Sequence, residues 1–84
     1  MRLDGNAAAG ALQEVFPFDA TLALATCASC GAAAELGTAL AYVDAPGVVL
    51  RCASCESVLL RLARNENRIW LELSGCASLQ LARS

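Results

Sequence analysis

The sequence of 84 residues contains no histidine and no lysine, and only four of its residues are aromatic. Without histidine, the chain alone can form neither a Ser-His-Asp triad nor a Cys-His pair. Its carboxylates are scattered, and no glycine-rich loop of the kind that binds phosphate is present. We therefore expect that the chain by itself is not an enzyme and has no small-molecule substrate. Any metal site would have to use cysteine, aspartate or glutamate as ligands.

Basic residues are also few, because six arginines stand against eight acidic residues and give a net charge of −2. Domains that bind nucleic acid normally carry a clear excess of basic residues on one face. The overall charge therefore gives no domain-wide footprint for nucleic acid.

Long apolar runs are missing as well. The longest uncharged stretch, residues 20–34, has 15 residues, whereas a membrane-spanning helix needs about 20. Asp4 and Asn6 stand where a signal peptide would have its apolar segment. We expect a cytoplasmic protein with no membrane association. In a reducing compartment, paired cysteines more often bind metal or do redox chemistry than form structural disulfides.

Large core side chains are scarce, although 57% of the residues are hydrophobic, because many of these residues are alanine. At about this chain length a hydrophobic core alone rarely contributes more than about 3–5 kcal/mol. A bound metal ion or a covalent link would therefore add substantially to the stability of the fold.

The residue pattern predicts a small, metal-stabilised α+β fold with a single domain over residues 1–84. Residues 4–16 are predicted to form an N-terminal helix, from the helical spacing of their apolar residues. Segments within residues 21–74 predict an antiparallel sheet of three to five strands, with strands expected at 21–26, 36–43, 48–51, 57–63 and 68–74. Residues 75–84 are expected to add a short edge strand or a tail.

What the sequence does contain is a repeated pair of thiols. Cys-Ala-Ser-Cys occurs at residues 27–30 and again at 52–55, which gives the pattern C-x2-C-x21-C-x2-C. Two cysteines separated by two residues form a turn, called a knuckle, that directs both sulfurs to one point, and a tetrahedral Zn²⁺ needs four ligands. The predicted zinc ligands are Cys27, Cys30, Cys52 and Cys55. Such a site is closed and structural; iron in the same geometry, a dithiol redox site and disulfides are the alternatives.

The residues next to the two knuckles differ. Gly31 follows the first knuckle and adopts a positive φ easily, whereas Glu56 follows the second and does so less freely. We therefore expect the second knuckle to differ slightly in shape. Four thiolates around Zn²⁺ leave a local charge of −2, which Arg51 is placed to offset in part. Cys76 is the odd thiol, either a small buried apolar residue near the sheet or a reactive, exchanging thiol.

At these cysteines the chain resembles a zinc ribbon, a knuckle–hairpin–knuckle fold, over about residues 21–74. The entire chain, including Leu3-Asp4-Gly5-Asn6 and Val58-Leu59-Leu60-Arg61-Leu62, is also similar to a family of short, uncharacterised zinc-ribbon proteins from bacteria with GC-rich genomes. That resemblance implies the same four cysteines as zinc ligands and carries no established activity. Ala28 and Ala53 stand where many ribbons have proline.

Three functions remain open from the sequence. The first is an interaction module for a protein partner, suggested by Trp70 between Arg68 and Glu72, unless the helix or the tail covers Trp70 and makes it core. The second is nucleic-acid binding through a hairpin that carries Arg61, Arg64 and Arg68, with Trp70 or Tyr42 stacking on a base. The third is zinc storage or handling.

Overall fold

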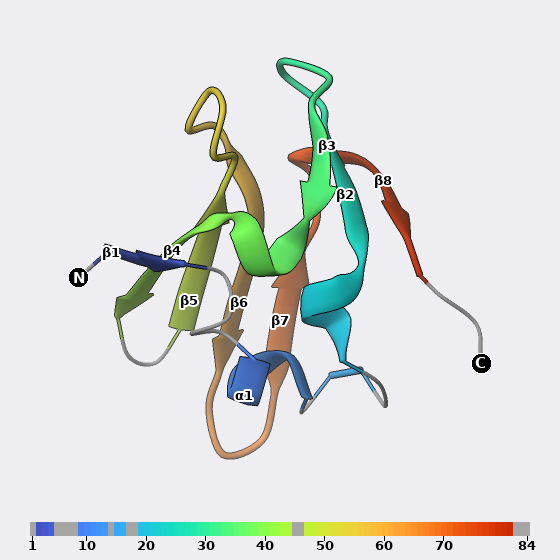
Figure 1. Ribbon diagram of the computed structural model, residues 1–84. Helices are drawn as coiled ribbons and strands as arrows, with labels where there is room; N and C mark the ends of the chain where they lie inside the picture. The colour runs from blue at the N-terminus through green and yellow to red at the C-terminus, as the bar shows by residue number, and fades with distance from the viewer. Residues whose placement is uncertain (1, 5–8, 14, 17–18, 45–46, 82–84) are drawn as a thin grey trace.

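The computed structural model describes residues 2–4, 9–13, 15–16, 19–44 and 47–81, and these form a mainly β protein (Figure 1). In chain order the elements are β1 (Arg2–Asp4), α1 (Ala9–Gln13), the 3₁₀ turn η2 (Ala20–Leu22), β2 (Leu24–Cys27), β3 (Ala33–Glu35), the 3₁₀ turn η3 (Leu36–Thr38), β4 (Leu40–Asp44), β5 (Gly47–Arg51), β6 (Val58–Arg64), β7 (Ile69–Glu72) and β8 (Cys76–Gln80). Every strand pair is antiparallel.

The strands form two sheets rather than the single sheet predicted from the sequence. The larger sheet has the order β1-β4-β5-β6-β7, and the smaller has the order β3-β2-β8. The two sheets part between the knuckles, where η3 interrupts the chain so that β3 pairs with β2 while β4 pairs with β5. The Thr38 hydroxyl donates to the Glu35 carbonyl (2.7 Å) across this turn. The segment between the two knuckles therefore contributes β3 to the smaller sheet and β4 and β5 to the larger one.

The predicted N-terminal helix over residues 4–16 is wrong: among its described residues only Ala9–Gln13 are helical, while residues 5–8 and 14 lie outside the described residues. Residues 2–4 form β1, which pairs with β4, and α1 has only five residues. Such a short helix is unstable in isolation because nucleation is costly, so it depends on tertiary packing. Leu12 supplies that packing, with its side chain almost completely buried. Among the described residues, no helix is long and apolar enough to cross a lipid bilayer.

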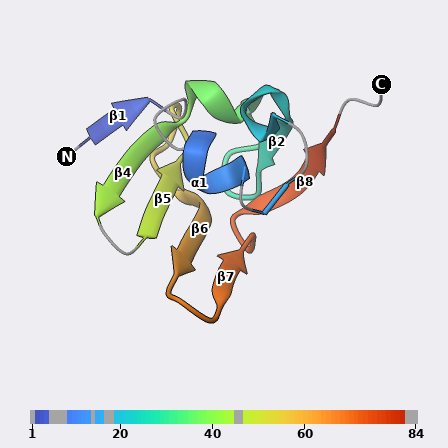
Figure 2. The same cartoon turned by 90° about the horizontal axis from the view of Figure 1, so that it is seen from below.

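The core lies between the two sheets, with α1 inside the curve of the larger sheet (Figure 2). The largest buried side chains come from α1, η3, β5 and β6, namely Leu12, Leu36, Leu50, Leu60 and Leu62. Buried alanines from both sheets occupy much of the remaining space. Cys27 and Cys52 belong to the same buried cluster, so the thiol site borders the core directly.

Because side chains alternate along a strand, the second face of the larger sheet points away from this core. We call it the outer face; among its described residues are Leu40, Tyr42, Val49, Arg51, Arg61, Ala63, Trp70 and Glu72. The register places Arg61 opposite Val49 on one side and Glu72 on the other, and it places Trp70 opposite Ala63. The Trp70 side chain is 53% exposed. Neither the helix nor the described part of the tail buries it.

Gly75 permits a close backbone approach between the β7–β8 connection and β6. Its carbonyl accepts a hydrogen bond from the Ala28 N–H of the first knuckle (2.9 Å). A Cβ atom on Gly75 would overlap the backbone carbonyl of Val58. We predict that Gly75→Ala lowers the free energy of unfolding by about 2–3 kcal/mol, because backbone must shift to relieve the overlap. Chemical denaturation of the two proteins side by side measures this loss.

Gly10→Ala is the matched control for this prediction. No atom lies within 4 Å of a Cβ placed on Gly10, and alanine favours a helix by about 1 kcal/mol over glycine. The control is therefore expected to be as stable as the native protein or slightly more so. Equal losses in the two variants would contradict the steric explanation.

Candidate metal centre

The two knuckles belong to different sheets. The first (residues 27–30) follows β2 and leads to β3 in the smaller sheet, and the second (residues 52–55) joins β5 to β6 in the larger sheet. Figure 1 shows both loops at the same end of the molecule. Their four sulfur atoms all lie within 4.8 Å of one another. The structure thus brings together all four cysteines that the sequence predicted as ligands.

The distances between the sulfurs fit a tetrahedral ion. The Cys27 and Cys55 Sγ atoms are 3.6 Å apart, and the Cys30 and Cys52 Sγ atoms are 3.7 Å apart. Four sulfurs at about 2.3 Å from one Zn²⁺ would be about 3.8 Å apart. A disulfide requires about 2.05 Å, and each of these close pairs joins one knuckle to the other. The arrangement can therefore hold a single metal ion within four thiolates.

Backbone hydrogen bonds show that the two knuckles have the same shape. In the first knuckle, the Gly31 N–H donates to the Cys27 carbonyl (2.9 Å), and the Ser29 N–H donates to the Cys27 Sγ (3.4 Å). In the second, the Glu56 N–H donates to the Cys52 carbonyl (2.8 Å). The Ser54 N–H likewise donates to the Cys52 Sγ (3.4 Å).

The expectation that Glu56 would give the second knuckle a different shape is therefore wrong. Gly31 has a φ of +80° and Glu56 has a φ of +64°. The turn requires a left-handed residue at this position, and Glu56 adopts that conformation despite its side chain. A residue with a Cβ atom is strained there by about 1–2 kcal/mol.

Before metal binds, Cys30, Cys52 and Cys55 differ in their acidity. The hydroxyl and N–H of Ser57 hydrogen-bond to Cys55 and lower its pKa to about 6. The N–H groups of Cys55 and Ser54 lower the pKa of Cys52. For Cys30, the N–H of Ala32 acts to lower the pKa, but hydrogen bonding with Cys55, desolvation and the other thiols outweigh it and raise the pKa to about 11. Metal binding at neutral pH must therefore displace a proton from Cys30.

Arg51 connects the second knuckle to the outer face. Its Nη1 donates to the Glu56 carbonyl (3.0 Å), and its guanidinium lies over the Tyr42 ring, 5.5 Å from the ring centroid. That Arg51 offsets part of the charge of the thiolates stays a prediction. The contact with Tyr42 was not predicted, although both residues lie on the same face once β4 and β5 are paired in register.

Cys76 lies beside the site but outside the four-sulfur cluster. The register places it opposite Cys27 across the β2–β8 pair. Its half-buried thiol donates to the Leu59 carbonyl (3.4 Å). Burial, followed by the charge on Cys27, raises the pKa of Cys76. A thiol held in the protonated form is a poor nucleophile, so the structure favours the packing role over the reactive one.

The predicted surface cluster of Arg61, Arg64, Arg68 and Trp70 is divided by the structure. Arg61 and Trp70 lie on the outer face. Arg64 lies opposite Ile69, one position along from the Ala63–Trp70 pair, and therefore points to the other face. Arg68 lies at the end of the β6–β7 loop, where its N–H donates to the Asn65 side chain (2.8 Å). The three arginines do not form one basic patch.

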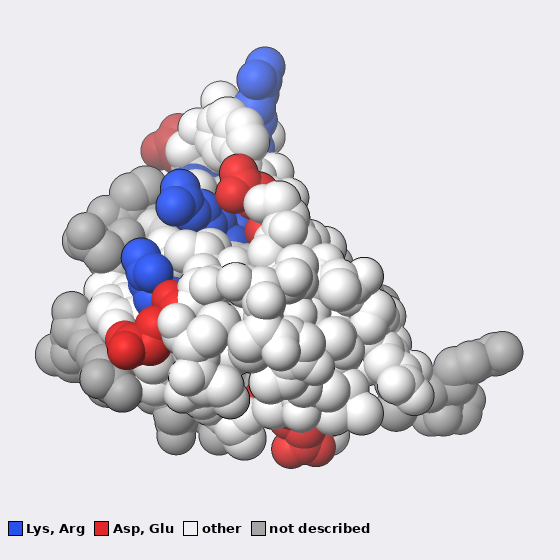
Figure 3. All heavy atoms as spheres, turned by 90° about the horizontal axis from the view of Figure 1, so that it is seen from above, with Lys and Arg blue, Asp and Glu red and all other residues white. Residues whose placement is uncertain are grey.

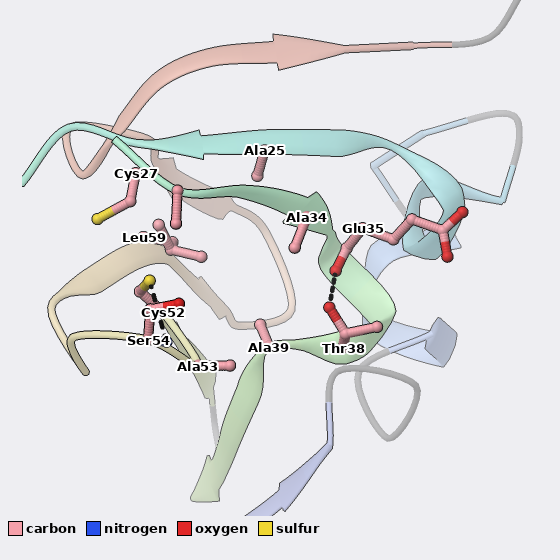
Figure 4. Close-up of a pocket in the computed structure, with 11 residues that line it drawn as sticks. Ala25, Cys27, Ala34, Glu35, Thr38, Ala39, Cys52, Ala53, Ser54 and Leu59 are labelled. Atoms are coloured by element: carbon pink, nitrogen blue, oxygen red, sulfur yellow. Dashed lines mark hydrogen bonds between the residues drawn. The ribbon is translucent and has the colours of Figure 1, made fainter. Parts of the chain in front are cut away.

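A small cavity adjoins the thiol site between the two sheets (Figure 4). It is lined mainly by alanines from both sheets together with Cys27, Cys52 and Leu59. Its volume of about 30 Å³ has room for about one water molecule. A substrate of ordinary size does not fit there.

The fold and the site define a small antiparallel β protein with a four-cysteine cluster that can hold a metal ion. The whole chain, residues 1–84, matches a family of unknown function (DUF6510), and the protein belongs to that family. No curated protein and no solved structure matches the chain.

The left-handed residues of the knuckles give a direct test of the site's backbone. We predict that Gly31→Ala lowers the free energy of unfolding by about 1 kcal/mol through backbone strain alone, because no atom lies within 4 Å of the added Cβ. Glu56→Gly removes the same strain and is expected to raise the free energy of unfolding by up to about 1 kcal/mol. Both are measured by denaturation at a fixed zinc concentration. A loss of stability in Glu56→Gly would contradict a matched pair of turns.

Proposed function

We propose that the protein is a non-enzymatic module in which one structural zinc ion fastens two sheets together and the outer face of the larger sheet binds a protein partner. The observation that carries the proposal is the set of four sulfurs within 4.8 Å of one another, contributed by one knuckle from each sheet. Zinc suits a purely structural site because it has no redox chemistry and prefers four tetrahedral ligands.

The expected energy of metal binding supports a structural role. Zinc bound by peptides of this kind contributes about 10–16 kcal/mol at neutral pH. The buried core consists largely of leucine and alanine, and a core at this chain length contributes only a few kcal/mol. The free energy of metal binding is therefore large enough to decide whether the two sheets stay together.

Closure of the site argues against catalysis and against zinc delivery. A catalytic zinc ion keeps one coordination position open for water or substrate, whereas four thiolates fill all positions here. The neighbouring cavity of about 30 Å³ admits no substrate. A closed four-thiolate site also releases its metal slowly, which disfavours a storage or handling role.

The outer face has the features of a protein-binding surface. Two shallow depressions of about 320 and 400 Å³ lie side by side on it and share Arg61. The first is lined in part by Tyr42 and Arg51, and the second by Trp70. Exposed tryptophan, tyrosine and arginine are the side chains that dominate binding energy in protein interfaces.

Charges on the outer face favour a protein over a nucleic acid as the partner. Glu56 lines the first depression and Glu72 the second, so each acid lies near Arg61. Figure 3 shows arginine and acidic side chains interspersed along one side of the molecule. A phosphate backbone would meet repulsion at both acids. Nucleic acid remains the second candidate because Arg51 and Arg61 flank the aromatic rings of Tyr42 and Trp70, on which bases can stack.

The metal is the first point to test. We predict one zinc ion per chain by elemental analysis, with four sulfur neighbours at about 2.3 Å by X-ray absorption. Changing all four ligand cysteines to serine is expected to unfold the chain, because the metal then has no thiolate ligands. Strong chelators and acid are expected to unfold it too, since chelators remove the metal and acid protonates the thiolates. Cys76→Ser is the matched control and should keep the metal.

Three outcomes would contradict this picture. If the variant without the four thiols is fully folded, the fold does not depend on the metal. An absorption spectrum typical of iron in the purified protein would show that the bound metal is iron rather than zinc. Rapid zinc loss to a weak chelator with the fold retained would favour zinc handling.

The outer face is the second point to test. We predict that Trp70→Ala and Arg61→Ala each reduce partner capture from extracts of the native cell by at least tenfold, the loss typical of an interface hot spot. Leu22→Ala is the control, since Leu22 is 61% exposed and lies in η2, outside the larger sheet. A labelled single-stranded RNA is titrated in parallel. Strongly salt-dependent RNA binding that is lost in Arg61→Ala would favour the nucleic-acid role instead.

A further inference from the structure

β7 forms one edge of the larger sheet and pairs with β6 alone among the described strands. Figure 2 shows it at the margin of that sheet. Ile69 and Trp70 in β7, and Leu73 just after it, are large apolar side chains that are exposed to solvent. An edge with unpaired backbone groups and apolar side chains is suited to pairing with another strand.

The hydrogen-bond pattern shows which backbone groups β7 presents at this edge. The Asn65 N–H donates to the Arg68 carbonyl (2.9 Å), so the Asn65–Arg68 pair is a hydrogen-bonded one. Hydrogen-bonded and non-hydrogen-bonded pairs alternate along an antiparallel ladder. Trp70 and Glu72 therefore bond to β6, opposite Ala63 and Arg61. The N–H and C=O groups of Ile69 and Leu71 point away from β6 toward the open edge.

We propose that β7 pairs antiparallel with β7 of a second copy of this chain, about a two-fold axis at Trp70, so that the two larger sheets become continuous. The inference goes beyond the proposed function, because it uses the edge of the larger sheet and leaves the outer face of each copy open to a partner. In this register Ile69 of one copy is opposite Leu71 of the other. These are the residues whose backbone groups are free to form the new hydrogen bonds.

Side-chain complementarity supports this register. With the axis at Trp70, Arg68 of each copy is opposite Glu72 of the other, so the interface contains two opposite-charge pairs and one Trp70–Trp70 pair. All three are non-hydrogen-bonded pairs, in which facing Cα atoms approach to about 4.5 Å and side chains interact most closely. A two-fold axis normal to the sheet keeps the two outer faces on the same side.

Other registers lose this complementarity. An axis at Leu71 would place Trp70 opposite Glu72 and would need the backbone of Leu73, whose carbonyl already accepts from the Cys76 N–H (3.0 Å). An axis at Ile69 would place Arg68 opposite Trp70, and Glu72 would then lie outside the paired segment of β7. A strand of unrelated sequence would offer neither an acid opposite Arg68 nor a base opposite Glu72, so these two residues also discriminate against foreign strands.

The short contact sets the expected strength. A strand pair of this length lies at the low end of interface size, where association is weak and transient. We expect a dissociation constant on the order of 10–100 µM, measured by sedimentation equilibrium of the zinc-loaded protein over a range of concentrations.

Charge reversal tests the register directly. Arg68→Glu places acid opposite acid, and Glu72→Arg places arginine opposite arginine, so each variant alone is expected to weaken association at least tenfold. An equimolar mixture of the two variants restores both opposite-charge pairs and is expected to regain the mass of a dimer. Glu35→Arg is the matched control, because it makes the same charge change on the exposed edge strand β3 and should leave the dimer intact.

The outcomes separate this inference from the proposed function. A folded, zinc-loaded protein that stays monomeric up to about 1 mM would overturn the dimer and leave the metal-stapled module standing. So would a dimer that either charge reversal leaves unchanged, or a mixture of the two variants that stays monomeric. Elemental analysis and circular dichroism on the same samples report the zinc content and the fold, on which the proposed function depends.

Discussion

The structure depends on the convergence of four sulfurs from two sheets that share no strand pair among the described residues. Within each sheet, backbone hydrogen bonds and cross-strand packing hold the strands in place. Between the sheets there is a thin core of leucine and alanine. The cluster lies at one end of that core, where Cys27 and Cys52 are themselves buried. An ion bound there would join the sheets at the point where side-chain packing gives way to solvent.

The local geometry of the knuckles explains how the chain can bring the sulfurs together. Each turn uses one left-handed residue and directs a backbone N–H at a sulfur. The same turns adjust the acidity of the thiols, lowering the pKa of Cys55 to about 6. Arg51 extends this arrangement to the surface, because it contacts both the Glu56 carbonyl and the Tyr42 ring. The second knuckle and the outer face are therefore parts of one connected structure.

Sequence patterns could predict the parts of this structure that are local. The spacing of the cysteines is sufficient to define a four-ligand set, and alternation places β5, β6 and β7 within one or two residues of the segments 48–51, 57–63 and 68–74. The division into two sheets could not be predicted, because it depends on η3 turning a single arm between non-local partners. The helix over 4–16 was predicted too long because the pattern does not show that Asp4 belongs to a strand paired with β4, or that α1 ends at Gln13.

The separation of the arginines has a similar cause. The sequence suggested a strand ending at Ala63, with Arg64 in a loop where its direction is unconstrained. The strand in fact continues through Arg64, and residues three apart in a strand point to opposite faces. A difference of one residue in the end of β6 thus removes a basic patch and leaves Arg61 with Trp70. This is the kind of detail that strand pairing decides and composition does not.

The exposure of Trp70 follows from how the fold is stabilised. A protein of this length that relied on apolar burial alone would gain by placing its single tryptophan in the core. Here the core uses leucine and alanine, and Trp70 stands on the outer face at 53% exposure. If a metal ion supplies the stability that the core lacks, the largest aromatic side chain is free to serve recognition. The metal centre and the outer face would then both follow from the same composition, in which a small core of leucine and alanine leaves the tryptophan outside.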